Sequence, residues 1–327
     1  MNPIRSKKSE ISADSLKANR TSNGMKILIT TGLSKSDIGG PAQYGSNLKD
    51  EFEKLGHEVR IRRCGSVEGA LAKIWADAFW ADKILALDTF SVGLPSVMAA
   101  RFFGKKVIVR VGGDFLWSAY ANRTGAKISL PAFYQNIPRL NFKEGIIFSL
   151  TKWMIGKTDF LAFNTEWQKN IWANYYQISK ERIGVVRNFI PEKNLASGDD
   201  GKFIWAGRVI PEKNISMLKK LGIEIVTNEP HEKVLERIRS CRAAVSLAFT
   251  DICPNFIIEA VSCGKPFIVT KYTGLGEIFP EGGIFVDPMN ESEIREAMEN
   301  LPSEEIQHTP HSWRQLAEDI LEIWKKI

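Results

Sequence analysis

The sequence has few cysteines and no long apolar run, and each shortage excludes a class of protein. The four cysteines among 327 residues form no C-x-x-C pair, so neither a zinc site nor a disulfide framework is expected. No apolar run approaches the roughly 18–20 residues that cross a bilayer. The first 24 residues are polar and basic without an apolar stretch, which argues against a secretory signal. We therefore expect a cytoplasmic protein with reduced thiols.

Acidic charge is scarce in the first two thirds of the chain. Residues 1–24 carry a net charge of +3 and residues 25–196 a net charge of +9, whereas residues 197–327 carry −6. An uneven charge of this kind indicates a partner rather than a fold. An anionic membrane surface or a phosphorylated acceptor suits it. Nucleic acid suits it less, because no basic motif is interleaved with aromatic residues.

Short apolar strands alternate with helical patterns along two successive stretches of the chain. Strands are predicted at Lys26–Thr31, Glu58–Arg62, Lys83–Asp88, Val107–Val111, Asp159–Asn164 and Ile183–Arg187, and then at Lys202–Ala206, Ile223–Thr227, Ala243–Ala248, Pro266–Thr270 and Gly283–Val286. Helices are predicted at 42–55, 67–79, 91–103, 142–156 and 165–177, and then at 212–221, 231–240, 255–263, 290–300 and 312–326. Such alternation predicts parallel sheets with helices on both faces.

A cluster of Pro, Asn, Ser, Gly and Asp at Pro191–Gly201 separates the two series. We therefore expect a disordered basic tail over 1–24, a first Rossmann-like domain over 25–196 and a second, shorter one over 197–307. The last segment, 308–327, is expected to form a helix. Ligands in such sheets bind beyond the carboxyl ends of the strands.

The first motif is Gly207–Asn214, GRVIPEKN, directly after a predicted strand. Pro211 suits the first position of a helix, where free N–H groups and the helix dipole favour anions. Arg208 and Lys213 would add positive charge there, and together they would hold a diphosphate. The alternative is a solvated basic loop.

The second motif is Asp251–Pro266, DICPNFIIEAVSCGKP, in which a loop leads into a helix that ends at a glycine. Asp251 and Glu259 are eight residues apart, and a carboxylate can accept two hydrogen bonds from adjacent sugar hydroxyls. Between them, N–H groups at Pro254–Ile257 would face a second anion site. The alternative is that Asp251 is a turn residue and Glu259 an ordinary surface residue of the helix.

The third motif is Gly39–Gly45, GGPAQYG, between the first strand and the first helix. Gly39 and Gly40 would permit close approach of the backbone to a ligand. The spacing is not that of a dinucleotide fingerprint, and a tight turn without a ligand is the alternative.

These motifs resemble those of the large retaining glycosyltransferase family numbered four, which has the GT-B fold. The resemblance covers about residues 25–300 and is strongest over 204–278. It implies two facing Rossmann-like domains with a cleft between them and a C-terminal helix that crosses back to the first domain. It also implies that the N-terminal domain binds the acceptor and the C-terminal domain the nucleotide-sugar donor.

The resemblance assigns roles by matching position. Catalytic roles fall to Arg208 and Lys213, which would contact the donor diphosphate, and to Asp251 and Glu259, which would contact the sugar and the ribose. The backbone around Asn255, Phe256 and Ile257 would contact the sugar and phosphate, and Gly39 and Gly40 would approach the diphosphate. The family requires no metal, and no D-x-D motif stands out here, so we expect neither a metal nor a cofactor other than the sugar nucleotide itself.

The sequence departs from the family pattern in three places. Asp251 stands where the family has the longer Glu. The strand Val107–Val111 leads to Gly112-Gly113-Asp114 rather than to a His, so Asp114 is a candidate for positioning the acceptor or donor. Between Asn214 and Ala243 there is room for about one strand–helix unit where the family has more.

The sequence therefore predicts a metal-independent, retaining hexosyltransferase that transfers sugar from a nucleotide-sugar to a glycan, lipid-linked or small-molecule acceptor. Its place would be polysaccharide or glycoconjugate synthesis, peripherally at the inner face of the membrane. The alternatives are a sugar-nucleotide epimerase of the same fold and a non-catalytic nucleotide-sugar-binding protein. The amphipathic segment Phe142–Lys157 either covers the sheet or touches the membrane, and His57 and His231 are predicted to be surface residues.

Overall fold

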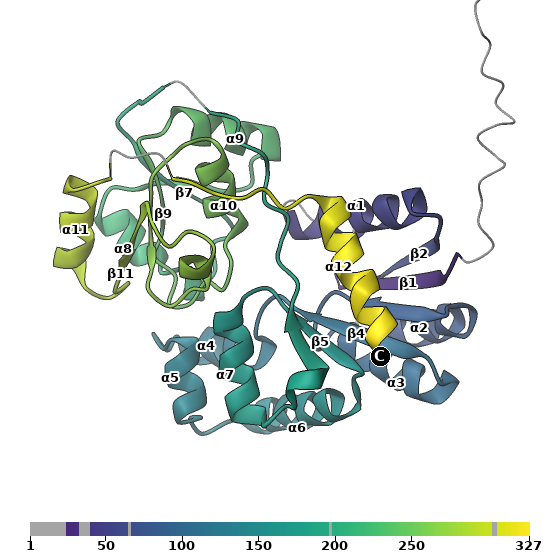
Figure 1. Cartoon of the computed structure of the whole chain (residues 1–327). Coiled ribbons are helices and arrows are strands. Elements are labelled where there is room, and N and C mark those ends of the chain that lie inside the picture. The colour runs from purple at the N-terminus through teal and green to yellow at the C-terminus, as the bar shows by residue number, and fades with distance from the viewer. Residues whose placement is uncertain (1–23, 33–39, 65–66, 196–197, 303–305) are drawn as a thin grey trace, which may run out of the picture.

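The computed structural model describes residues 24–32, 40–64, 67–195, 198–302 and 306–327. Over these residues the chain folds into two α/β domains, and a final helix returns from the second domain to the first (Figure 1). Gly39 and residues 1–23 of the predicted tail lie outside the described residues.

The N-terminal domain holds a six-stranded parallel sheet with the order β2-β1-β3-β4-β5-β6. Its strands are β1 Lys26–Thr31, β2 Glu58–Arg63, β3 Lys83–Ala86, β4 Lys106–Val111, β5 Phe160–Phe163 and β6 Ile183–Val185. Its helices are α1 Gly40–Lys54, α2 Val67–Trp80, α3 Gly93–Phe103, α4 Phe115–Thr124, α5 Leu130–Gln135, α6 Phe142–Lys157 and α7 Glu166–Tyr176.

The C-terminal domain holds a five-stranded parallel sheet with the order β11-β10-β9-β7-β8. Its strands are β7 Phe203–Ala206, β8 Glu224–Val226, β9 Ala243–Ser246, β10 Phe267–Thr270 and β11 Gly283–Val286, and its helices are α8 Ile215–Lys220, α9 His231–Ser240, α10 Asn255–Ser262 and α11 Glu291–Glu299. A single strand, β8, lies between β7 and β9 in the chain, as the short spacing predicts. The predicted strands and the predicted fold class are confirmed.

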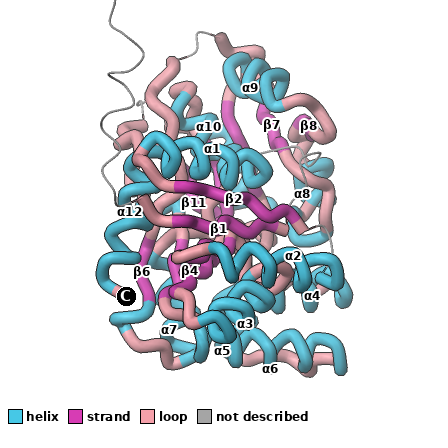
Figure 2. The backbone as a smooth tube through the Cα atoms, turned by 90° about the vertical axis from the view of Figure 1, so that its right-hand side faces the viewer, coloured by secondary structure: helices cyan, strands magenta, loops and turns pink. Residues whose placement is uncertain are grey.

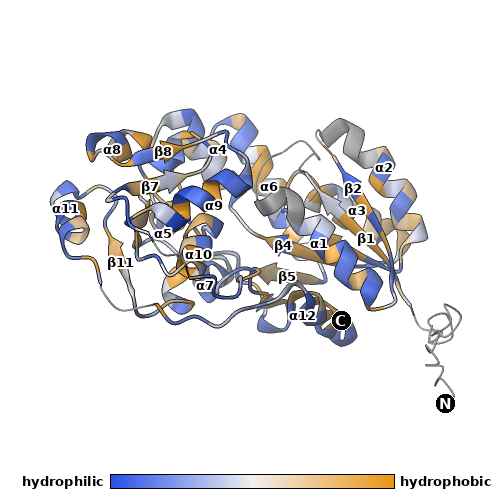
Figure 3. Cartoon of the chain, turned by 90° about the horizontal axis from the view of Figure 1, so that it is seen from above, coloured by the Kyte–Doolittle hydropathy of each residue, from blue (hydrophilic) through white to orange (hydrophobic). Residues whose placement is uncertain are grey.

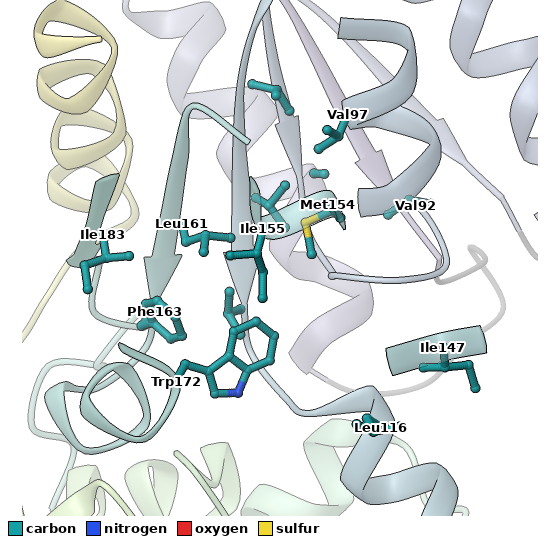
Figure 4. Close-up of a cluster of buried hydrophobic side chains, with 14 of the residues drawn as sticks. Val92, Val97, Leu116, Ile147, Met154, Ile155, Leu161, Phe163, Trp172 and Ile183 are labelled. Atoms are coloured by element: carbon teal, nitrogen blue, oxygen red, sulfur yellow. The ribbon is translucent and has the colours of Figure 1, made fainter. Parts of the chain in front are cut away.

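Successive residues of the central strands point to opposite faces of the N-terminal sheet. In β1, Ile27 and Ile29 join a buried cluster beneath α1, whereas Leu28 joins the cluster beneath α2, α3 and α6. Figure 4 shows part of the second cluster, with Met154 of α6 and Trp172 of α7. In β7, Ile204 and Trp205 likewise belong to two different clusters. Both sheets are thus covered on both faces, which explains why their strands are apolar runs.

Helices α4 and α5 are not among the predicted helices. They have ten and six residues, too few for a periodic pattern to stand out. α4 begins where the Asp114 side chain accepts a hydrogen bond from Trp117 N–H, and α5 begins where Ser129 accepts one from Ala132 N–H. These caps and tertiary packing, rather than periodicity, stabilise both helices.

The last helix, α12 Trp313–Lys326, packs against the N-terminal domain (Figure 1). A capping box between Ser312 and Gln315 begins it. Its buried side chains belong to the same cluster as β1 and α1, and they are Leu316, Ala317, Ile320 and Trp324. The exposed residues of this helix are mostly charged, and Figure 3 shows hydrophilic residues along α9, α11 and α12. The last helix therefore packs against β1 and α1, the first elements of the N-terminal domain.

If α12 is part of the N-terminal core, Ile320→Ala should lower the free energy of unfolding by about 2–5 kcal/mol, because Ile320 is 1% exposed and the substitution leaves a cavity. Urea titration of the full chain measures this. Glu322→Ala, on the exposed side of α12 with its side chain 57% exposed, is the matched control and should change little. Equal stability of the two variants would contradict the docking of α12.

Candidate functional site

The strand order of the C-terminal sheet places two loops side by side at its carboxyl edge. The chain leaves β7 toward β8 on one side and returns to β9 on the other. In open parallel sheets ligands bind where the order reverses in this way. The first two motifs lie in these loops, with 207–214 after β7 and 247–254 after β9.

Lys213 and Asp251 meet across the two loops. Lys213 Nζ lies 2.8 Å from Asp251 Oδ2, and Ser246 Oγ at the end of β9 donates a hydrogen bond to the same oxygen at 3.2 Å. The loops are also joined through the backbone, where Phe249 N–H donates to the carbonyl of Glu212 at 3.0 Å. The Lys213 and Asp251 side chains are 22% and 15% exposed. The pair is therefore partly sheltered but can still be reached by a ligand.

The turn that carries Lys213 corrects the prediction of one helix over 212–221. Pro211–Lys213 form a single 3-10 turn, and α8 begins only at Ile215. Asn214 separates the two because its backbone is left-handed, with φ of 55°, and its side-chain amide donates to the Pro288 carbonyl at 2.9 Å. Because α8 has only six residues, the helix dipole predicted at Pro211 is largely lost. The positive charge of this loop comes from its side chains.

Arg208 lies exposed on the same loop. Within the described part of the chain, no hydrogen bond or ion pair engages its guanidinium group. The next residues, Val209 and Ile210, face Gly125 and Lys127 of the N-terminal domain across a groove of about 340 Å³. Arg208 is thus available to an anion, and Lys127 is a further cation beside this loop that no sequence motif indicates.

The first turn of α10 offers two backbone N–H groups rather than the longer run predicted. The Ile257 N–H donates to the Pro254 carbonyl at 3.1 Å, and a proline has no N–H group. Among the described residues, no acceptor engages the N–H groups of Asn255 and Phe256. The side-chain oxygen of Asn255 accepts a hydrogen bond from Asn188 at 3.4 Å. The backbone N–H groups that could meet an anion at α10 are therefore those of residues 255 and 256.

Glu259 is paired with a histidine that sequence reasoning places on the surface. His231 Nε2 lies 3.0 Å from Glu259 Oε1, and the two side chains are 38% and 19% exposed. The hydrogen bond to Glu259 raises the pKa of His231 above its ordinary value, against the opposing effect of partial burial. His231 is the first residue of α9, and only the packing of α9 against α10 brings it to Glu259. No local pattern in the sequence indicates this contact.

A cavity of about 340 Å³ lies between the domains, and Glu259 and Asn255 form part of its wall. Three aromatic residues also line the cavity. The rings of Phe189 and Trp313 stack with centroids 4.9 Å apart and planes at 5°, and Tyr44 of α1 meets Trp313 edge to face at 5.1 Å. The cavity therefore combines carboxylate, amide and guanidinium groups with aromatic rings, and it draws on both domains, their linker and α12.

The third motif lies at the equivalent edge of the N-terminal sheet. Gly40 is the first residue of α1, and β1 is flanked by β2 and β3, so α1 begins where this strand order reverses as well. Gly39 falls outside the described residues. The assignment of both glycines to a donor site stays a prediction.

Asp114 is buried in the N-terminal domain, with 4% exposure. Its carboxylate accepts hydrogen bonds from Trp117 N–H at 2.8 Å, the Tyr134 hydroxyl at 2.7 Å and Trp172 Nε1 at 2.9 Å. Burial raises the pKa of Asp114, although these hydrogen bonds oppose the shift. Through these contacts Asp114 joins α4, α5 and α7. If it helps to position a substrate, it does so by holding these helices.

The loop after β9 also connects the two domains. Its Thr250 Oγ1 accepts a hydrogen bond from the Leu130 N–H of α5 at 2.8 Å, and its Phe249 and Ile252 belong to the main buried cluster of the N-terminal domain. Burial raises the pKa of the Cys253 thiol to about 12, so this thiol is not a ready nucleophile. The candidate site is thus held by the same loop that docks the domains.

The C-terminal domain matches a known family. Residues 184–304 match the family model described as glycosyl transferases group 1. An uncharacterised glycosyltransferase of Methanocaldococcus jannaschii is 24% identical over 258 residues, which cover 66% of this chain and 74% of that protein. The family match includes both motif loops and α10.

The fold of the whole chain is similar to that of solved structures. Sucrose-phosphate synthase from Thermosynechococcus elongatus superposes with a TM-score of 0.67 at 12% identity, covering 92% of this chain and 94% of that chain. The UDP-GlcNAc 2-epimerase of Methanocaldococcus jannaschii superposes with a TM-score of 0.54 at 15% identity, covering 93% and 99%. At these identities the likeness concerns the fold alone. The two domains have the GT-B arrangement, and the family match and the curated relative support a group 1 glycosyltransferase.

Proposed function

We propose that this chain is a retaining, metal-independent hexosyltransferase of the family numbered four. The observation that carries the proposal is the meeting of two motifs of that family at the switch point of one sheet. Lys213 after β7 contacts Asp251 after β9, and Glu259 follows on α10 beside the cavity between the domains. All three lie within the segment that matches group 1 glycosyl transferases.

The donor diphosphate would bind at the loops after β7 and β9. Arg208 and Lys213 supply two cationic side chains, the second of which is paired with Asp251, and the N–H groups of Asn255 and Phe256 supply two donors. Asp251 holds the Lys213 ammonium group at the edge of the loop, so its shorter side chain serves to orient a cation. A carboxylate that keeps Lys213 in place lowers the entropy lost when phosphate binds.

The ribose would bind beside Glu259. A carboxylate can accept hydrogen bonds from two adjacent hydroxyl groups, and Glu259 has one oxygen engaged by His231. His231 therefore fixes the rotamer of Glu259 before the donor arrives. Phe189 and Trp313, whose rings stack on each other, line the same cavity as this carboxylate and offer a flat surface to a ring.

In the reaction, the bond between the sugar C1 and the leaving phosphate oxygen breaks, and a bond from C1 to the acceptor oxygen forms on the same face. A phosphate oxygen of the leaving diphosphate takes the acceptor proton, so no nucleophile of the protein is needed. Negative charge grows on the diphosphate as the bond breaks. Arg208 and Lys213 stabilise it where it develops, which favours the transition state over the bound substrate.

The acceptor would be a glycan, a lipid-linked sugar or a small molecule bound by the N-terminal domain. The positive charge of that domain suits a phosphorylated acceptor at an anionic membrane, as in polysaccharide or glycoconjugate synthesis on the cytoplasmic face. The chain also shares its fold with a UDP-GlcNAc 2-epimerase, so epimerisation of the sugar nucleotide is the competing function.

A thermal-shift screen against nucleotide sugars tests donor binding, because a bound ligand raises the melting temperature. The donor that binds is then incubated without an acceptor. A transferase should leave its sugar unchanged or hydrolyse it slowly, whereas an epimerase would convert it, and that result would replace the proposal. Binding without turnover in the presence of any acceptor would indicate a non-catalytic binding protein.

Replacing Lys213 or Glu259 by alanine should leave the fold intact and abolish most transfer. For Lys213→Ala we expect kcat to fall roughly 10²–10³-fold, the usual effect of removing one group that stabilises developing charge. Lys219→Ala is the matched control, because Lys219 is an exposed lysine on α8 of the same domain and should retain full activity. Full activity in Lys213→Ala would remove the basis of the assignment.

The His231–Glu259 pair predicts a pH dependence of stability. Since the pKa of His231 is raised in the folded protein, the pair stabilises the fold fully below the ordinary pKa of about 6.5 and loses this contribution as pH rises through the raised pKa. The loss of melting temperature caused by His231→Gln should therefore be larger at pH 5.5 than at pH 8.5.

Glutamine keeps a polar contact without the titrating charge. In a Glu259→Gln background the effect of His231→Gln should no longer depend on pH. If His231→Gln lowers the melting temperature of the otherwise wild-type protein equally at pH 5.5 and pH 8.5, the two side chains are not coupled through charge.

A further inference from the structure

The layer formed by α2, α3 and α6 exposes large apolar side chains to solvent. The three helices pack side by side over one face of the N-terminal sheet (Figure 2). The six exposed side chains, here called the aromatic face, are Phe79 of α2, Met98 and Phe102 of α3, and Phe142, Ile146 and Trp153 of α6. Phe142 is 86% exposed, Phe79 71% and Phe102 70%. Large apolar side chains that are exposed together on one layer of helices mark an interaction surface.

The aromatic rings on α2 and α3 also contact one another. Trp75 lies 4.9 Å from Phe102 between ring centroids, and Phe79 lies 5.7 Å from Phe103. The exposed rings of Phe79 and Phe102 therefore each pack against an aromatic ring of the neighbouring helix. On α6, exposed residues 142, 146 and 153 recur at helical spacing along one side. The apolar surface thus follows the outward side of the helical layer.

The exposed charges described on the three helices of the aromatic face have one sign. The exposed charged side chains described on these helices are basic, and they are Lys73, Arg101, Lys143, Lys152 and Lys157. The acidic side chains described there are buried and paired, Asp77 with Arg62 and Glu144 with Arg123. Asp159, just beyond α6, neutralises Arg101 but leaves the three lysines of α6 without an acidic partner among the described residues.

We propose that the aromatic face binds peripherally to an anionic lipid surface. Phenylalanine and tryptophan side chains enter the interfacial region of a bilayer, and lysines beside them interact with anionic headgroups. In the described part of the chain, no helix is long and apolar enough to cross a membrane. A second copy of the chain fits less well, because a symmetric contact would bring two sets of lysines together.

This proposal deepens the proposed function and rests on it only in giving access to a lipid-linked acceptor. The binding itself is measured without donor or acceptor. The full chain is sedimented with vesicles of phosphatidylcholine alone and with vesicles containing one quarter phosphatidylglycerol. We expect binding to the anionic vesicles, weaker binding at high salt, and little binding to the neutral ones.

The double substitution Phe79→Ser with Phe102→Ser should lower the fraction bound roughly tenfold. Lys152→Glu with Lys157→Glu should abolish the preference for anionic lipid. The matched controls are Met289→Ser, an exposed apolar residue of the C-terminal domain, and Lys219→Glu with Lys233→Glu, exposed lysines of the same domain. Both controls should bind as the wild type does.

Wild-type protein that stays in the supernatant, or aromatic-face variants that bind like the controls, would overturn the proposal. So would a dimer in solution that the Phe79→Ser, Phe102→Ser variant converts to a monomer. Donor-induced thermal shifts are measured on the same variants and should be unchanged, because the aromatic face does not contribute to the candidate site. If the wild-type protein showed no donor-induced thermal shift, that result would instead count against the proposed function.

Discussion

The reversal of strand order between β7 and β9 is the constraint on which the candidate site depends. Because the chain leaves β7 in one direction and reaches β9 from the other, the loops after these strands emerge next to each other with room between their helices. The Lys213–Asp251 ion pair and the backbone hydrogen bond from Phe249 to Glu212 then join the two loops. The positions of α10 and its Glu259 follow from that junction.

The second requirement is that the two domains face each other at a defined separation. The loop after β9 contributes to this through Thr250 and Phe249, which contact the N-terminal domain. The linker and α12 contribute on the other side, where Phe189 stacks on Trp313 and Trp313 meets Tyr44. Binding and domain docking thus use neighbouring residues of the same segments, so a ligand at the site can alter the contact between the domains.

Much of the fold and part of the site could be predicted from the sequence. The strands are apolar runs because both sheets are covered on both faces, and such runs are visible in the sequence. Arg208, Lys213, Asp251 and Glu259 could be selected because their motifs follow strands. The short helices α4 and α5 could not, because they depend on caps at Asp114 and Ser129 and on packing. The division of the helix after β7 depends on the left-handed backbone of Asn214, which its contact with Pro288 stabilises.

The sequence by itself determined the alternation of strands and helices, the two-domain division and the order of the motif residues, because these depend on local periodicity, turns and caps within a few residues. Tertiary structure alone decided which side chains meet. His231 reaches Glu259 only through the packing of α9 on α10. The long-range hydrogen bonds of Asp114 come from Tyr134 and Trp172. The aromatic face exists only because α2, α3 and α6 lie in one layer. Such contacts join residues far apart in the chain, and sheet order and helix packing set them.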